Sequence, residues 1–99
     1  MCGAKAGGPS TDGVVLTDES VIQGVVTQAG EPVAGAYVRL LDGGGEFTAE
    51  VPTSATGQFR FFAAPGTWTL RTLAPGAVTV DQDVVAAKGT IAEVAVTLD

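Results

Sequence analysis

Hydrophobic and polar residues alternate along most of the chain after residue 20, and this alternation predicts a series of strands. Seven such segments, separated by turns rich in Gly and Pro, are 21–28, 36–41, 46–51, 58–63, 67–73, 77–85 and 91–98. A period of two residues is typical of strands with one buried face. Because turn signals return about every 8 to 12 residues, the chain is predicted to be an all-β sandwich of seven strands.

The alternation also predicts which side chains face the core. The residues expected there are Ala36, Val38, Leu40, Phe59, Phe61 and Trp68. Phe62 falls on the opposite face of its strand, so it either covers a second apolar layer, such as residues 14–16, or is exposed at an interface. Gly24 lies inside the first strand, which predicts that another backbone or a ring comes close to it.

Composition agrees with a single small β domain and adds an N-terminal arm. The 99 residues include 14 Gly and five Pro, which suit short strands joined by turns. Residues 1–19 are small and polar, so we expect a flexible arm there and the sandwich over 20–99. No segment approaches the roughly 18 apolar residues of a membrane helix, and the opening residues lack a secretory signal. We therefore expect a cytoplasmic protein with no membrane partner.

The charges argue against nucleic acid and suggest an interaction surface. The net charge is −6, and the five cations are scattered, whereas nucleic-acid binding needs a basic patch. Arg39, Arg60 and Arg71 occupy outward positions of three different strands. If those strands are neighbours, the arginines form a ladder with acids or an anion site. The acids considered are Glu46, Glu50 and Glu93. With Phe62, the three arginines form the predicted interaction surface.

Few residue types that carry catalysis are present. The chain has no His and one Cys, which excludes Ser–His and Cys–His pairs and most catalytic zinc sites. Asp42-Gly43-Gly44-Gly45 lacks the Lys and Ser or Thr of a phosphate-binding loop. Two carboxylate pairs, Glu46 with Glu50 and Asp81 with Asp83, are more simply explained as solvated strand faces. We expect no metal, no cofactor and no enzymatic activity.

Several of these motifs together resemble a known domain. They are Ile22-x-Gly24-x-Val26, Gly30-x-Pro32-x-x-Gly35-Ala36-x-Val38-x-Leu40, Thr56-Gly57-x-Phe59-x-Phe61 and Pro65-Gly66-x-Trp68-x-Leu70. In order and spacing they resemble the carboxypeptidase regulatory-like, transthyretin-type domain. The resemblance covers residues 21 to about 73 and implies a prealbumin-like Greek-key sandwich. Isopeptide crosslinking, found in adhesin relatives of this sandwich, is excluded because the first strand has no Lys and the chain has no Asn.

A narrower resemblance rests on longer segments. Arg39-Leu40-Leu41-Asp42, residues 46–51, residues 54–66, Trp68-Thr69-Leu70-Arg71 and the Met1-Cys2 start are similar to the small actinobacterial SseC-like proteins. Genes of that family lie beside thiosulfate sulfurtransferase genes, and its biochemical role is not established. The resemblance implies an accessory role in sulfur metabolism with a sulfurtransferase as the protein partner, and it brings no catalytic residues.

Three functions remain open from the sequence. The first is a non-enzymatic module that binds a protein partner. The second is a sulfur or metal carrier that uses Cys2, whose thiol would share a residue with the α-amine after removal of Met1; a nearby ammonium lowers the pKa of a thiol. The third is a structural oligomer formed through edge strands. The sequence does not fix the oligomeric state.

Overall fold

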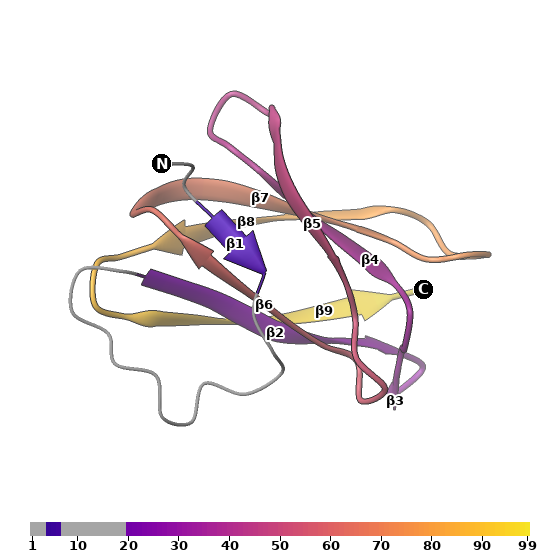
Figure 1. Cartoon of the computed structure of the whole chain (residues 1–99). Helices are drawn as coiled ribbons and strands as arrows, with labels where there is room; N and C mark the ends of the chain where they lie inside the picture. The colour runs from indigo at the N-terminus through magenta and orange to yellow at the C-terminus, as the bar shows by residue number, and fades with distance from the viewer. Residues whose placement is uncertain (1–3, 7–19) are drawn as a thin grey trace.

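Two stacked β-sheets make up the part of the chain that the computed structural model describes, residues 4–6 and 20–99, and this part contains no helix (Figure 1). Its strands are β1 (Ala4–Ala6), β2 (Ser20–Gln28), β3 (Glu31–Pro32), β4 (Tyr37–Leu41), β5 (Phe47–Pro52), β6 (Gln58–Ala63), β7 (Gly66–Leu73), β8 (Val80–Ala86) and β9 (Ile91–Leu98). All seven predicted strands are present, and the all-β sandwich is confirmed. Two short strands, β1 and β3, are present in addition to the seven predicted.

Strand order differs between the two sheets. The four-stranded sheet runs β5-β4-β7-β8 and is antiparallel throughout. In the five-stranded sheet β2 is central, with β6 on one side and β9 on the other, and β1 and β3 complete the β6 side. The pairing of β2 with β9 is parallel and continuous from 21 with 91 to 28 with 98. The C-terminal strand is therefore fixed against the strand that begins the sandwich.

The predicted boundary near residue 20 coincides with the start of β2 at Ser20. Within the predicted arm, residues 4–6 form β1, which pairs with β6. Cys2 lies outside the described residues, as do residues 14–16, which were considered as a cover for Phe62.

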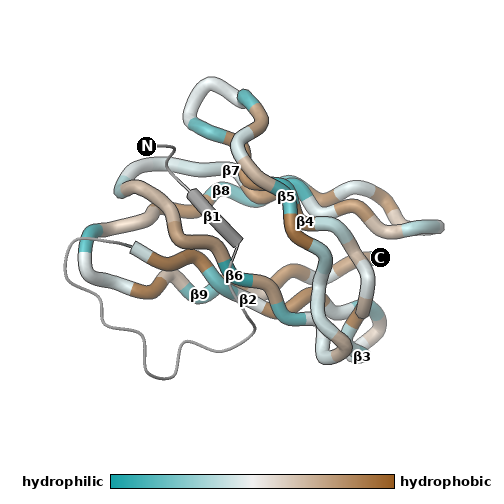
Figure 2. The backbone as a smooth tube through the Cα atoms, viewed as in Figure 1, coloured by the Kyte–Doolittle hydropathy of each residue, from teal (hydrophilic) through white to brown (hydrophobic). Residues whose placement is uncertain are grey.

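The core lies between the sheets and contains the six residues named above as expected there. Its fully buried side chains include Phe61, Ile22, Leu40 and Leu70. Phe59 and Phe61 pack with ring centroids 6.3 Å apart, and burial of each ring contributes roughly 2–3 kcal/mol. Trp68 is buried as well, and its indole N–H donates to the Ala64 carbonyl at 2.9 Å. Figure 2 shows the hydrophobic segments concentrated in the strands, with the β4–β5 loop pale or teal.

A tight turn connects β2 to β3, and residues 33–36 then lead to β4. Gly30 and Gly35 adopt φ angles of 81° and 72°, which an L side chain rarely takes. The Val33 N–H donates to the Val26 carbonyl. Buried Thr53 then holds the segment that leads into β4. Its hydroxyl donates to the Val33 carbonyl at 2.6 Å and accepts from the Ala36 N–H at 3.0 Å. These bonds set where β4 begins and therefore which of its side chains face outward.

At Gly24 both β9 and the Phe59 ring of β6 approach β2 closely. A Cβ atom at this position would lie 1.9 Å from the Val94 carbonyl oxygen of β9 and 2.8 Å from the ring of Phe59 in β6. The prediction that a backbone or a ring approaches Gly24 is confirmed, and both do. Only a residue without a side chain allows this ladder and this ring position together.

We expect Gly24→Ala to lower the free energy of unfolding by about 1–3 kcal/mol or more, because a backbone carbonyl rather than a flexible side chain must move. Urea unfolding followed by far-UV circular dichroism measures the change. Gly43→Ala is the matched control, since its Cβ would meet nothing nearer than 3.8 Å and its stability should be almost unchanged. Equal stability of the two variants would contradict the close approach at β9.

Candidate interaction surfaces

A row of four charged residues crosses the outer face of the four-stranded sheet. Arg39 on β4 is the direct cross-strand partner of Glu50 on β5 and of Arg71 on β7, and Arg71 is in turn the partner of Asp81 on β8. The two arginines are adjacent, and each has a carboxylate on its other side. We call these four residues the charged row.

Hydrogen bonds hold both arginines of the charged row in place. Arg39 Nε donates to Glu50 Oε1 at 2.6 Å. Arg71 donates from Nε to Asp81 Oδ1 at 2.9 Å and from Nη2 to Oδ2 at 3.0 Å, the bidentate geometry that favours Arg–carboxylate pairs. The predicted salt-bridge ladder is confirmed for Arg39 with Glu50. The partner of Arg71 is Asp81, which alternation alone did not match to it.

The Arg71–Asp81 pair changes the protonation of both groups. The hydrogen bond from Arg71, more than its charge, lowers the pKa of the Asp81 carboxyl below its ordinary value, and slight desolvation opposes this. The hydrogen bond to Asp81 and the charge of its carboxylate raise the pKa of Arg71. The pair is exposed, so solvent screens it and it orients the side chains more than it stabilises the fold.

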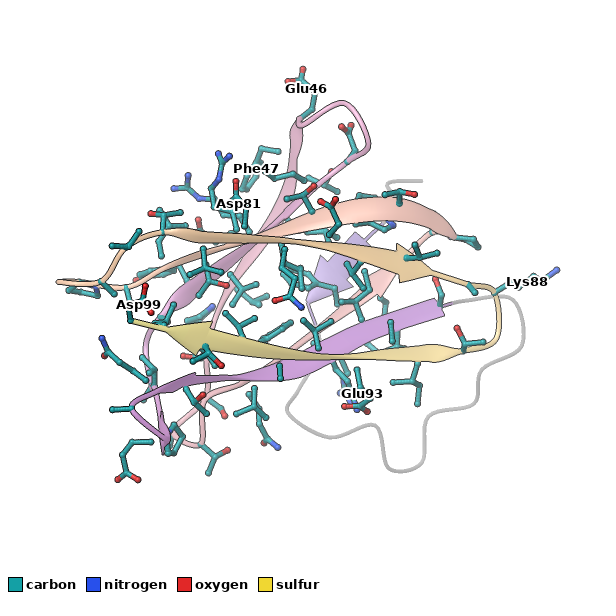
Figure 3. All side chains as sticks on the ribbon, turned by 180° about the vertical axis from the view of Figure 1, so that it is seen from behind. Glu46, Phe47, Asp81, Lys88, Glu93 and Asp99 are labelled. Atoms are coloured by element: carbon teal, nitrogen blue, oxygen red, sulfur yellow. The ribbon has the colours of Figure 1, made fainter. Side chains whose placement is uncertain are left out.

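Exposed apolar side chains lie on the same outer face as the charged row. Tyr37, Phe47 and Val85 are 50%, 62% and 67% exposed. Alternation put Phe47 on the same side of β5 as core-facing Val51, but an irregularity in the β4–β5 ladder shifts the register, so that Phe47 pairs with Leu41. This bulge turns the ring outward, because one extra residue exchanges the two faces of a strand. Figure 3 shows Phe47 and Asp81 on the same side of the sandwich.

A second polar row lies on the outer face of the five-stranded sheet. Gln23 on β2 is the direct partner of Arg60 on β6 and of Glu93 on β9. Gln23 Nε2 donates to Glu93 Oε2 at 2.6 Å. The Arg60 guanidinium lies 5.3 Å from the ring centroid of Phe62 on the same strand, within the range of a cation–π contact. Glu93 projects from the side of the sandwich opposite Phe47 (Figure 3).

Arg60 is buried, although its position on β6 predicted an outward side chain. Its exposed fraction is 8%, and its Nε and Nη1 atoms have no hydrogen-bond acceptor among residues 4–6 and 20–99. Within the same residues, Gln23 Oε1 beside it is buried without a donor. A buried donor without an acceptor typically costs about 1–3 kcal/mol, and more when the group is charged.

The four residues predicted to share one surface therefore lie on two. Arg39 and Arg71 belong to the four-stranded sheet and pair with each other, whereas Arg60 and Phe62 belong to the five-stranded sheet on the other side of the core. The physical reason is topological: β6 crosses to the opposite sheet after β5, and outward positions of different sheets face in opposite directions. Phe62 is half-buried rather than freely exposed.

The loop and acidic residues considered for phosphate or metal chemistry have local structural roles. Asp42 Oδ1 accepts the N–H groups of Gly44 and Glu46 at 2.9 Å and 3.0 Å, which closes the loop. Asp83 accepts a hydrogen bond from the Thr69 hydroxyl at 3.2 Å. Residues 4–6 and 20–99 contain no group of three or more potential metal-binding side chains. In the same residues, no helix has the length and hydropathy needed to span a bilayer.

Comparison with protein families places the whole sandwich in one group. The family model described as a protein of unknown function (DUF1416) matches residues 2–98. The chain belongs to the DUF1416 family. An uncharacterized protein of Mycolicibacterium smegmatis is 68% identical over 62% of this chain and 69% of its own length. An uncharacterized Mycobacterium tuberculosis protein is 60% identical over 74% and 75%. The predicted link to SseC-like proteins and sulfurtransferases stays a prediction.

Solved structures similar to this DUF1416 chain share its fold at low identity. The minor pilin GBS52 of Streptococcus agalactiae has a TM-score of 0.70 at 13% identity over 84% of this chain. The major pilin BcpA of Bacillus cereus has a TM-score of 0.71 at 17% identity over 81%. The chain spans only 45% and 28% of these pilins. A dioxygenase domain from a Streptomyces species scores 0.67 at 12% identity. These likenesses show a β-sandwich fold and no activity.

We expect Arg71→Gln to raise the pKa of the Asp81 carboxyl toward its ordinary value, because the bidentate hydrogen bond is lost. Since the folded-state pKa of Asp81 is lowered, the stability from this pair is present above the unfolded-state pKa and is lost as pH falls through the folded-state value. A ¹³C NMR titration of the carboxyl measures the shift. Arg39→Gln is the control; if it changed Asp81 as much as Arg71→Gln, the assignment of the pair would be wrong.

We expect Arg60→Met to increase the free energy of unfolding by about 1 kcal/mol or more, since methionine keeps an unbranched apolar stem and removes buried donors that lack acceptors. Thermal and urea unfolding measure the change. The contrasting variant is Arg39→Met, which removes an exposed, paired arginine and should cost roughly 0–1 kcal/mol. Destabilisation by Arg60→Met greater than that by Arg39→Met would show that Arg60 is satisfied in the folded protein.

Proposed function

We propose that this DUF1416 chain is a non-enzymatic binding module that docks a protein partner on the outer face of its four-stranded sheet. The observation that carries the proposal is the combination of Tyr37, Phe47 and Val85, all at least half exposed, with arginines already held in fixed positions. Binding surfaces of this kind place apolar anchors beside oriented polar groups.

The composition of this face fits protein recognition. Tyr, Phe and Arg are enriched in protein–protein interfaces relative to the rest of the surface. The arginines of the charged row keep their orientation through Glu50 and Asp81, so little side-chain entropy is lost when a partner covers them. Their charges are balanced within the row, so the affinity would come mainly from the apolar side chains.

A binding role agrees better with the described residues than a catalytic role does. The shifted pKa values belong to an exposed ion pair, whereas catalytic groups are characteristically perturbed by burial in a cleft. A shallow depression beside β9 is lined by Gly24, Val25, Glu93, Val94 and Ala95. That set holds one acid and no nucleophile, and it offers no second group for acid–base chemistry.

The proposed setting follows from the resemblance to SseC-like proteins. The partner would be a thiosulfate sulfurtransferase in the cytoplasm, and the module would act as an accessory to it. A sulfur or metal carrier role for Cys2 stays the alternative prediction, since Cys2 lies outside the described residues.

The test measures binding of a purified thiosulfate sulfurtransferase from the same organism by isothermal titration calorimetry. We expect the double variant Tyr37→Ala/Phe47→Ala to weaken binding about 30-fold or more, the loss typical of interface anchors. Val85→Ser should weaken binding, whereas Val78→Ser should not, although the two valines are 67% and 69% exposed. Val78 lies in the β7–β8 connection, outside the strands of the four-stranded sheet.

Two outcomes would count against the proposal in different ways. Binding that is equally strong in wild type and the double variant would overturn the assignment to this face. Absence of any binding to the sulfurtransferase would overturn the proposed partner class. Circular dichroism spectra of each variant establish that the sandwich is intact.

A further inference from the structure

We propose that the edge of β9 that faces away from β2 pairs antiparallel with β9 of a second copy, which joins two five-stranded sheets into one. This surface is separate from the proposed partner-binding face, because it uses the backbone of β9 rather than the outer face of the four-stranded sheet. A failed sulfurtransferase experiment therefore leaves it intact, and the reverse also holds.

The backbone of β9 offers regularly spaced hydrogen-bonding groups on its open side. Among residues 4–6 and 20–99, β9 pairs with β2 alone. At the start of that ladder the Val21 N–H donates to the Thr90 carbonyl at 3.0 Å. In a parallel ladder, alternate residues direct both backbone groups to the same neighbour. Residues 92, 94, 96 and 98 consequently face β2, and residues 91, 93, 95 and 97 present their N–H and C=O groups to the open edge.

The edges of the other sheet carry more features that discourage strand addition than β9 does. Edge strand β8 has Asp81 and Asp83 on its outer face, and edge strand β5 is interrupted by the bulge and ends at Pro52. Charges, bulges and proline are the usual means by which proteins block edge pairing. From Ile91 to Leu98 there is no proline, no irregularity and one charge, Glu93.

The sequence of β9 is complementary to itself when the two-fold axis passes at Val94. In this register Glu93 faces Ala95 of the second copy, and Ile91 faces Thr97. On the inner face Ala92 lies opposite Val96. Away from the axis each larger side chain therefore meets a smaller one, and Val94 meets Val94 at the axis. The single acid of the strand avoids its own copy. A register centred at Glu93 would oppose two carboxylates, which is destabilising.

Exposure favours a second copy as the occupant, whereas net charge opposes it and makes the pairing depend on salt. Ile91 is 38% exposed in the single chain, and the opposed Thr97 would cover part of it. Each chain carries a net charge of −6, so two copies repel over the distance that salt leaves unscreened. The Debye length falls from about 30 Å at 0.01 M to about 8 Å at 0.15 M salt. A dimer held by backbone bonds should therefore become tighter as salt is added.

Sedimentation equilibrium of the full chain, from micromolar to about millimolar concentration, tests the proposal. We expect a reversible monomer–dimer equilibrium whose dissociation constant falls with added salt. Ala95→Glu places an acid opposite Glu93 at both symmetry-related positions and should weaken the dimer about tenfold. Ala95→Lys places a cation there and should tighten it.

Val85→Glu and Val85→Lys are the matched controls. Val85 lies on edge strand β8 two residues from Asp83, as Ala95 lies on β9 two residues from Glu93. The same charge changes at Val85 should leave the dissociation constant within about twofold of the wild-type value, because charges that are not opposed across the interface are screened.

Three results would overturn the proposal. A strict monomer up to millimolar concentration excludes pairing with a second copy. The edge of β9 would then be available only to a strand from another protein. A dimer that responds to Val85 and Ala95 substitutions alike does not use β9. Equal weakening by Ala95→Glu and Ala95→Lys contradicts the register, and with it the pairing described.

Discussion

The close approach of β9 to β2 at Gly24 is the constraint on which the sandwich depends. Strand β2 is central in its sheet and pairs with β6 on one side and β9 on the other. At Gly24 the Val94 carbonyl and the Phe59 ring both occupy space that a side chain would fill. The ladder that fixes the C-terminal strand and the aromatic packing of the core therefore share one position. A shift of the β2–β9 ladder would therefore also require a shift of the aromatic packing.

That constraint determines where function can lie. The space between the sheets is filled by apolar side chains from both, so the described residues leave chemistry to the two outer faces and the strand edges. The outer faces differ in kind. The four-stranded sheet presents paired charges among exposed apolar residues, whereas the five-stranded sheet holds Arg60 nearly buried beside Phe62.

Alternation predicted most of the fold and little of the surfaces. It identified the seven principal strands and core residues such as Phe61 and Trp68, because those depend on a local period that burial enforces. It placed Phe47 on the wrong face, since a one-residue bulge has no signature in the alternation itself. It also grouped Arg60 with Arg39 and Arg71. Whether two strands share a sheet is set by non-local pairing, which a single sequence does not reveal.

The different surroundings of the arginines favour the four-stranded sheet as the surface that meets a partner. Arg39 and Arg71 have carboxylates on both flanks of their row, so a partner that covers them meets almost no net charge and must gain its affinity from apolar contact. Arg60 is only 8% exposed and its Nε and Nη1 atoms are buried, so these donors are not accessible to an acidic group of a partner. Area and shape would therefore decide binding at the four-stranded sheet. The exposed rings of Tyr37 and Phe47 lie on the outer face of the four-stranded sheet, where apolar contact would provide the affinity.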